Sequence, residues 1–207
     1  MMNLKTSVFP AFVASIAAAI GLEGVSAEEP DPAVMALGKA TYQRTCITCH
    51  WIDGKGLPLG ADKKMAPPLV QSPYVQGDPS LFALIVLKGV ARVDEKWFGT
   101  MLPLEMQLDE KTKTIDLNEK QLAAVMTYVR NSFGNKAPEI TEADVKAARA
   151  KYSKITMPIQ RTTMEKLLEK SKKTAEAEKA AEKAAGEAKE KAAAVEAPAA
   201  KAPAATQ

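Results

Sequence analysis

The stretch Cys46-Ile47-Thr48-Cys49-His50 constrains this chain more than any other feature, because it holds both cysteines and the only histidine of the 207 residues. Two thiols separated by two residues and followed directly by an imidazole have the spacing that covalent haem attachment requires. Each sulfur can form a thioether with one vinyl group of the porphyrin, and a histidine nitrogen is a good axial ligand for the iron. The sequence therefore predicts one haem c, bound through Cys46 and Cys49 and ligated by His50.

Other uses of a Cys-x-x-Cys pair fit this sequence less well. A closed zinc site needs four ligands, and no Cys or His is left in the chain after these three residues. A thioredoxin-like redox pair needs a βαβ context, whereas the sequence around residue 46 has a helical pattern. A structural disulfide is the plainest alternative to haem attachment.

The first 27 residues have the pattern of a secretory signal peptide. Lys5 supplies a positive start, residues 8–20 form an apolar run, and Val25-Ser26-Ala27 offers small residues for cleavage. The apolar run is too short to span a bilayer comfortably, so an uncleaved anchor is the lesser alternative. We expect cleavage after Ala27 and a periplasmic or otherwise exported protein that is not transmembrane once the signal is removed.

Charge separates two parts of the chain. Residues 28–164 carry 18 Lys and Arg against 16 Asp and Glu, a near balance that argues against nucleic acid as a partner. Residues 165–207 hold nine Lys, eight Glu and many Ala without an aromatic residue, so they cannot bury a core. We expect a single solvated helix over 164–193, with disorder beyond it. A solubilising tail and an arm that docks on a partner or the cell envelope both fit this composition.

Helix signals recur between residues 30 and 134. Asp31-Pro32 and Asp78-Pro79 each place proline at the first helical position behind an N-capping aspartate. Asn118 begins a capping box, and the helix that follows it has apolar residues on one stripe. No stretch shows the alternation of a strand. The sequence predicts an all-α fold, with a further helix start at Thr141.

The loops between these helices carry the candidates for the second axial ligand. No second histidine exists, so that ligand is methionine or the site stays open. Of the nine methionines, Met65, Met101 and Met106 lie on expected loops. Met101 lies on a loop that begins with glycine and ends with proline, which can bring sulfur to the face opposite His50. Met101 is the leading candidate, and Met106 and Met65 are the alternatives.

A proline-rich loop is a candidate support for the proximal ligand. The segment Ala66-Pro67-Pro68-Leu69 is stiff, and its two prolines have no amide to donate. Such a segment can hold a backbone carbonyl against the ring N–H of His50 and so fix the orientation of the imidazole. An ordinary loop made rigid by proline is the alternative interpretation.

The stretch from about 33 to 134 resembles a class I mono-haem cytochrome c domain of the bacterial type. The segments that carry this resemblance are GKATY before CITCH, then DGKGLP, APPLVQSPYVQGDPS, the Met101 loop and LAAVMTYVRNSFGN. The resemblance implies three to five helices around one covalent haem, with the first and last helices crossing at Gly38, Tyr42 and Tyr128. It also implies Met101 as the sixth ligand, because the Met-x-Pro pattern of Met101-Leu102-Pro103 matches the family's ligand loop.

Two segments depart from that pattern. Residues 109–117 are inserted before the last helix of the domain, and residues 137–160 extend past its usual end. We expect a signal peptide over 1–27 and a cytochrome c domain over 28–136. A helical extension over 137–163 and an Ala/Lys/Glu-rich tail over 164–207 follow.

The resemblance implies electron transfer between redox protein partners rather than catalysis. With His50 and Met101 on the iron, both axial positions are filled and no substrate can coordinate. Two alternatives belong to other classes. One is a haem-bearing subunit of a larger dehydrogenase or oxidase, with residues 137–207 as its docking arm. The other is a haem sensor with an open sixth site.

Overall fold

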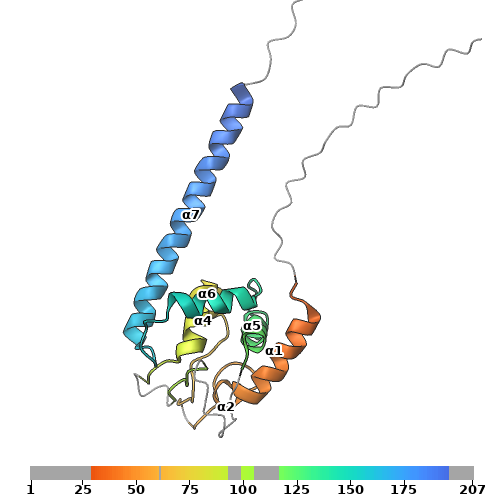
Figure 1. Cartoon of the computed structure of the whole chain (residues 1–207), viewed down its shortest axis with the longest axis vertical. Helices are drawn as coiled ribbons and strands as arrows, with labels where there is room; N and C mark the ends of the chain where they lie inside the picture. Colours follow the sequence, from red (N-terminus) through yellow and green to blue (C-terminus); the bar gives the residue numbers. More distant parts are fainter. Residues whose placement is uncertain (1–28, 61, 93–98, 105–116, 196–207) are drawn as a thin grey trace, which may run out of the picture.

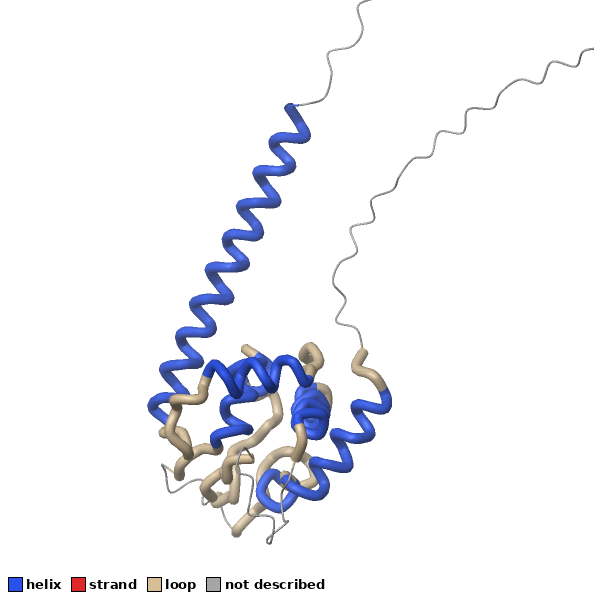
Figure 2. Tube along the Cα trace, viewed as in Figure 1, coloured by secondary structure: helices blue, strands red, loops and turns tan. Residues whose placement is uncertain are grey.

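The computed structural model describes residues 29–60, 62–92, 99–104 and 117–195. Within these ranges the secondary structure consists of helices and isolated β-bridges, as Figure 2 shows. The all-α prediction is therefore confirmed. The helices, in chain order, are α1 (Pro32–Thr45), α2 (Ile47–His50), α3 (Pro73–Gln76), α4 (Pro79–Lys88), α5 (Glu119–Arg130), α6 (Glu142–Lys151) and α7 (Arg161–Val195).

Side-chain caps fix where the helices begin. The carboxylates of Asp31 and Asp78 accept hydrogen bonds from amides in the first turns of α1 and α4, with proline at the first helical position. Asn118 and Thr141 each form a capping box with the side chain three positions further on. These bonds satisfy amides that have no partner inside the helix. All four predicted helix starts are confirmed.

The first and last helices of the predicted domain, α1 and α5, pack against each other (Figure 1). A Cβ at Gly38 would overlap the carbonyl oxygen of Ala124 and lie 2.6 Å from the Cβ of Tyr128, so only glycine permits this approach. Around the crossing, Tyr42, Tyr128 and Phe133 form a cluster with ring centroids 5.3–5.9 Å apart. The predicted crossing at Gly38, Tyr42 and Tyr128 is confirmed.

The core lies around α4, which is buried from Leu81 to Lys88. The apolar stripe of α5 faces this core, and α6 packs against both helices. Burying apolar side chains of this size contributes about 1.5–3 kcal/mol each. The core thus extends beyond the segment that resembles a cytochrome c domain, because α6 belongs to it.

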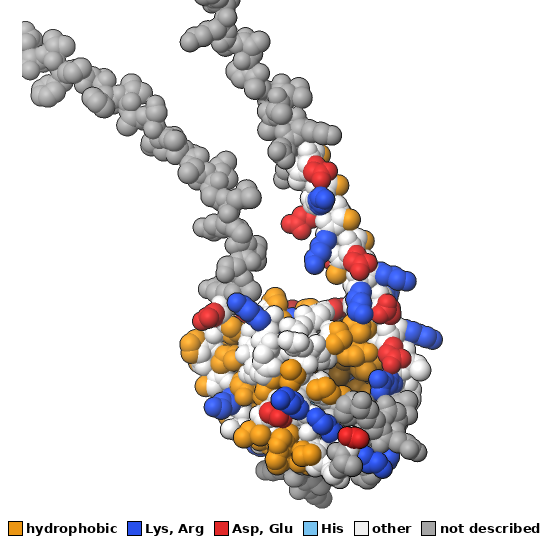
Figure 3. All heavy atoms as spheres, turned by 180° about the vertical axis from the view of Figure 1, so that it is seen from behind, with side chains coloured by type: hydrophobic (Ala, Val, Ile, Leu, Met, Phe, Trp, Pro, Cys, Tyr) orange, Lys and Arg blue, Asp and Glu red, His pale blue; other side chains and the backbone are white. Residues whose placement is uncertain are grey.

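Helix α7 differs from the expected tail in its first turns. Leu168 is buried, and Met164 and Leu167 pack against the core, so the prediction of a fully solvated helix is wrong there. These three apolar residues lie on one face of the helix. The stripe is so short that the composition of the tail, mostly Ala, Lys and Glu, did not reveal it. The helix also crosses the expected boundary between residues 163 and 164. Residues 172–188 are all exposed, and the far part of the helix projects from the globular part with Lys and Glu side chains on it (Figures 1 and 3).

Four sequence predictions fall wholly or largely outside the described residues. They are the signal peptide, the candidate ligand Met106, nearly all of the insertion over 109–117 and the disorder expected beyond residue 193. Among the described residues, no helix combines the length and the hydropathy needed to cross a membrane.

Candidate functional site

The Cys-x-x-Cys-His sequence forms one tight helical turn at the end of α1. Cys46 follows the last residue of α1, and its amide donates to the carbonyl of Tyr42 at 2.9 Å. The next helix, α2, contains Cys49 and His50, and the His50 amide donates to the Cys46 carbonyl at 2.9 Å. Side chains three apart on a helical turn lie on the same side, so both thiols face one direction. Both cysteines are free thiols and partly buried, and burial raises the pKa of each.

His50 is held as a neutral imidazole. Burial lowers the pKa of His50 to about 4, against a smaller opposing effect of the Pro67 backbone carbonyl. Its Nδ1 atom is buried and has no hydrogen-bond partner among the described residues. A neutral imidazole has a free lone pair, which is what a metal ligand needs. The thiols and this partly buried imidazole therefore fit a haem, whereas a disulfide would leave the histidine unexplained.

The predicted support from the proline-rich loop is present in part. The Pro67 carbonyl is close enough to His50 to favour the protonated ring, yet Nδ1 makes no bond that meets hydrogen-bond geometry. The loop itself is held firmly, since the Leu69 amide donates to the Gly54 carbonyl at 2.7 Å. The carbonyl of Pro67 is thus placed near the imidazole by a fixed segment.

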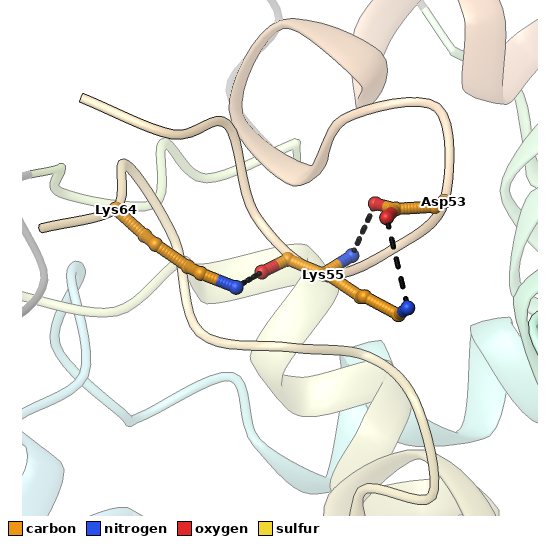
Figure 4. A network of polar contacts seen from close by, with 3 residues as sticks. All are labelled: Asp53, Lys55 and Lys64. Carbon is orange, nitrogen blue, oxygen red and sulfur yellow. Dashed lines mark hydrogen bonds and ion pairs between the residues drawn. The ribbon is translucent and has the colours of Figure 1, made fainter. Parts of the chain in front are cut away.

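The chain turns sharply directly after His50. Gly54 and Gly56 both have positive φ, and a Cβ at Gly56 would overlap the carbonyl oxygen of Ala66. The Gly56 amide donates back to the His50 carbonyl at 3.1 Å, so this loop folds over the end of α2. At its exposed edge, Asp53 accepts from the Lys55 amide at 3.0 Å, and Lys64 donates to the Lys55 carbonyl at 2.9 Å (Figure 4).

Two side chains that the sequence did not single out as supports hold the segments around His50. The Tyr42 hydroxyl donates to the carbonyl of Trp51 at 2.7 Å, which anchors the residue after the histidine. Asn135 is buried; its amide group donates to the Leu69 carbonyl and its oxygen accepts from the Gln71 amide. All three hydrogen bonds join positions with no local sequence pattern, so only the tertiary structure reveals them.

Met101 lies on a loop segment that is fixed by its backbone. The Met101 amide donates to the carbonyl of Val90 and its carbonyl accepts from the Val90 amide, both at 3.0 Å. Gly89 makes this approach possible, since a Cβ there would overlap the Met101 carbonyl oxygen. Met101 is partly buried and packs against the core. These contacts give the residue a defined place without assigning it a ligand role.

Met65 lies beside the same loop. Its carbonyl accepts from the Gly99 amide at 2.9 Å, and its sulfur lies 3.1 Å from where a Cβ on Gly99 would stand. The structure thus brings two of the three candidate methionines, Met65 and Met101, to one cluster of loops. Among the described residues, no group of three or more His, Cys, Asp or Glu is arranged to hold a metal ion.

The fold and the site together define an all-α haem-attachment domain whose first helix ends in Cys-x-x-Cys-His. Residues 35–133 match the family model described as Cytochrome c, so the chain contains a cytochrome c domain over this stretch. A domain of this kind implies a covalently bound haem c and a role in electron transfer.

Two relatives from different bacteria are similar to part of this chain. The chain is similar to the cytochrome c subunit of alcohol dehydrogenase (quinone) from Gluconacetobacter polyoxogenes, at 32% identity over 114 residues. The corresponding subunit from Komagataeibacter europaeus matches at the same identity and length. The matched segment covers 54% of this chain but only 22% of each relative. The chain therefore spans about a fifth of the length of the relatives that it matches.

Proposed function

We propose that this protein is a periplasmic electron carrier with one haem c, attached through Cys46 and Cys49 and ligated by His50 and Met101. The observation that carries the proposal is the position of a partly buried, neutral His50, with its Nδ1 atom buried, beside two free thiols inside a cytochrome c domain. Haem, when bound, supplies an iron that alternates between the ferric and ferrous states. The chain's own residues attach it, ligate it and keep water from it.

The methionine assignment follows from loop structure and ligand chemistry. Met101 is anchored to Val90 by two backbone hydrogen bonds, so its side chain starts from a fixed point. A thioether is a soft ligand that favours ferrous iron and raises the reduction potential. If His50 and Met101 both held the iron, no coordination position would remain for a substrate. This arrangement supports outer-sphere electron exchange as the function.

Absorption spectra of the full chain, produced with the haem-maturation machinery, test the ligand assignment. Met101→Ala should abolish the iron–thioether band, because the thioether is removed while covalent attachment through the cysteines persists. Met65→Ala is the matched control, since it makes the same change on the adjoining loop and should keep the band. Retention of the band in the Met101 variant would move the assignment to Met65 or Met106, and Met106→Ala then decides between them.

Membership of a larger dehydrogenase complex is the second candidate function, and the named relatives favour it. Helix α7 offers an arm for such a complex, because its distal part is exposed over all the side chains described. The test is affinity purification of the full chain and of a version lacking residues 172–207, which keeps the packed turns of α7. A second polypeptide that copurifies only with the full chain supports the complex, and a monomer in both preparations contradicts it.

Two further measurements address the remaining parts of the proposal. Mass spectrometry of protein from the periplasmic fraction should give a mature chain that begins at Glu28. A mature chain that retains residues 1–27 would contradict signal cleavage.

Carbon monoxide should bind the native ferrous protein poorly, because Met101 occupies the sixth position. Ready binding would favour a sensor with an open site.

A further inference from the structure

Val90 is paired on both edges of its backbone, once within the cytochrome c domain and once with the extension beyond it. On one edge it exchanges two hydrogen bonds of 3.0 Å with Met101. On the other edge, the Ile159 amide donates to the Gly89 carbonyl at 3.0 Å, and the Ala91 amide donates to the Ile159 carbonyl at 2.9 Å. We call this three-segment arrangement the Val90 bridge. Ile159 lies well past residue 133, where the family match ends.

The three segments of the Val90 bridge are packed closely against one another. Gly89 has a positive φ, and a Cβ there would overlap the Met101 carbonyl oxygen and lie 2.7 Å from the nitrogen of Pro103. On the far side, Ile159 is only 1% exposed and belongs to the hydrophobic core. A shift of Gly89–Ala91 would therefore be transmitted directly to the Met101 loop.

We propose that Ile159 is a positioning residue for the sixth ligand: it fixes the Gly89–Ala91 segment from the edge opposite Met101 and so keeps the Met101 loop closed. This inference rests on the proposed function, because it takes Met101 as the ligand. Ile159 itself contacts neither substrate nor iron in this proposal. It acts only through Val90 and its two neighbours.

The physical reason lies in how a ligand loop opens. A foreign ligand reaches the sixth position only when the methionine sulfur has moved away, which is a local unfolding event. The free energy of that event depends on the contacts that break, and on whether the segment paired with the Met101 loop is itself fixed. Because Ile159 anchors Gly89–Ala91 to the core, Met101 must separate from a held segment rather than carry it along. Loosening Ile159 should therefore raise the open fraction.

The test compares two isoleucines that lose the same methylene. Ile159→Val loosens the Val90 bridge, whereas Ile140→Val removes the same group from a residue that is 0% exposed and whose backbone bonds to the Thr127 side chain. Both full-length holoproteins are mixed with imidazole, and the rate at which it displaces the thioether is followed in the ferric state. We expect Ile159→Val to accelerate displacement roughly two- to tenfold, and Ile140→Val to leave it unchanged.

Global destabilisation is separated from positioning by urea unfolding of the same two proteins. Both variants should lose similar stability, while only the Ile159 variant admits imidazole faster. Equal displacement rates in the two variants, or a faster rate in the Ile140 variant, would overturn the positioning role. Hydrogen exchange at the Met101 amide gives a second readout that does not use the haem spectrum, and it should accelerate only in Ile159→Val.

The proposed ligand set and the positioning role fail in different ways. If Met101→Ala retains the iron–thioether band, the ligand assignment is wrong whatever the Ile159 variant does. If Met101→Ala loses the band but Ile159→Val behaves like Ile140→Val, then Met101 is the ligand and only the positioning role is rejected.

Discussion

The globular part and the distal arm of α7, residues 172–195, are both helical, but their helices persist for different reasons. Helix α4 consists largely of β-branched, aromatic and leucine side chains and is buried almost throughout. In the distal arm, every described side chain from Lys172 to Ala188 is exposed, so tertiary packing stabilises none of these positions. The arm depends on the propensity of Ala, Lys and Glu and on pairs such as Lys183–Glu187.

The comparison teaches that helix content and fold stability are separate quantities in this protein. A helix held by packing melts with its domain in one cooperative transition. A solvated helix instead frays gradually with temperature, because each added residue contributes little. Substitutions in the two regions should therefore change stability by different amounts. The same change, such as glycine to alanine, should even destabilise one region and stabilise the other.

The largest effect is expected for Gly38→Ala at the crossing of α1 and α5. The added Cβ would overlap the carbonyl oxygen of Ala124, a backbone atom that cannot move away alone. We expect a loss of about 3 kcal/mol in the free energy of unfolding, although alanine is the better helix former. Urea denaturation measures this loss, and a change within about 0.5 kcal/mol would show that the two helices can move apart freely.

Leu168→Ala tests where the globular part ends along α7. Leu168 is 8% exposed and anchors the first turns of the helix on the core. Its truncation should lower the free energy of unfolding of the globular part by about 2 kcal/mol, near the lower end of the range for Leu→Ala at buried positions. Thermal unfolding measures the effect, and Lys179→Ala in the distal arm is the control that should leave the midpoint unchanged. Equal midpoints for the two variants would mean that α7 is held by propensity along its whole length.

Gly186→Ala makes the same change as Gly38→Ala but in the distal arm, where a Cβ would meet nothing within 4 Å. Here alanine should stabilise the helix by roughly 0.8–1 kcal/mol, because only the propensity difference acts. Far-UV circular dichroism should show a small gain in helicity, with no change in the cooperative unfolding transition. A shift of that transition would instead reveal contact between the arm and the globular part.

The smallest effect is expected for the ion pairs of the arm. The Nζ atom of Lys183 lies 4.0 Å from Oε1 of Glu187, at positions i and i+4, and both side chains are strongly exposed. Glu187→Gln should reduce the free energy that stabilises the helix by about 0.2–0.5 kcal/mol. High salt should screen the same ion pair and so weaken the unmodified helix by a similar free energy. Helicity measured by circular dichroism at low and high salt checks both. A variant that still loses helicity on addition of salt to the same degree would rule out this pair as the source.

Local patterns made much of this structure predictable from the sequence. The caps at Asp31, Asp78, Asn118 and Thr141 depend on neighbours within a few residues, so the helix starts could be placed directly. The Cys-x-x-Cys-His turn is equally local. The crossing at Gly38 involves distant segments, and it was predictable only through the resemblance to a known family.

The features that the sequence missed are all non-local. Asn135 bonds to segments more than sixty positions away, and Ile159 pairs with Gly89 and Ala91 through backbone atoms that every residue possesses. Backbone pairing of a single residue leaves no periodic signal, and a buried asparagine resembles any turn residue. The docking of Leu168 was missed because three apolar residues open an otherwise polar helix.

The distal arm sets a distance between whatever binds its far end and the rest of the molecule. At about 1.5 Å per residue, residues 172–195 extend roughly 36 Å from the globular part. A partner domain of 100 residues has a radius of gyration of only about 13 Å. A small protein seated at the far end of the arm would therefore stay clear of the Cys46–His50 turn. One partner can reach both places only if it is large, so the proposed recruitment through the arm and the proposed electron exchange at the turn would use two different surfaces.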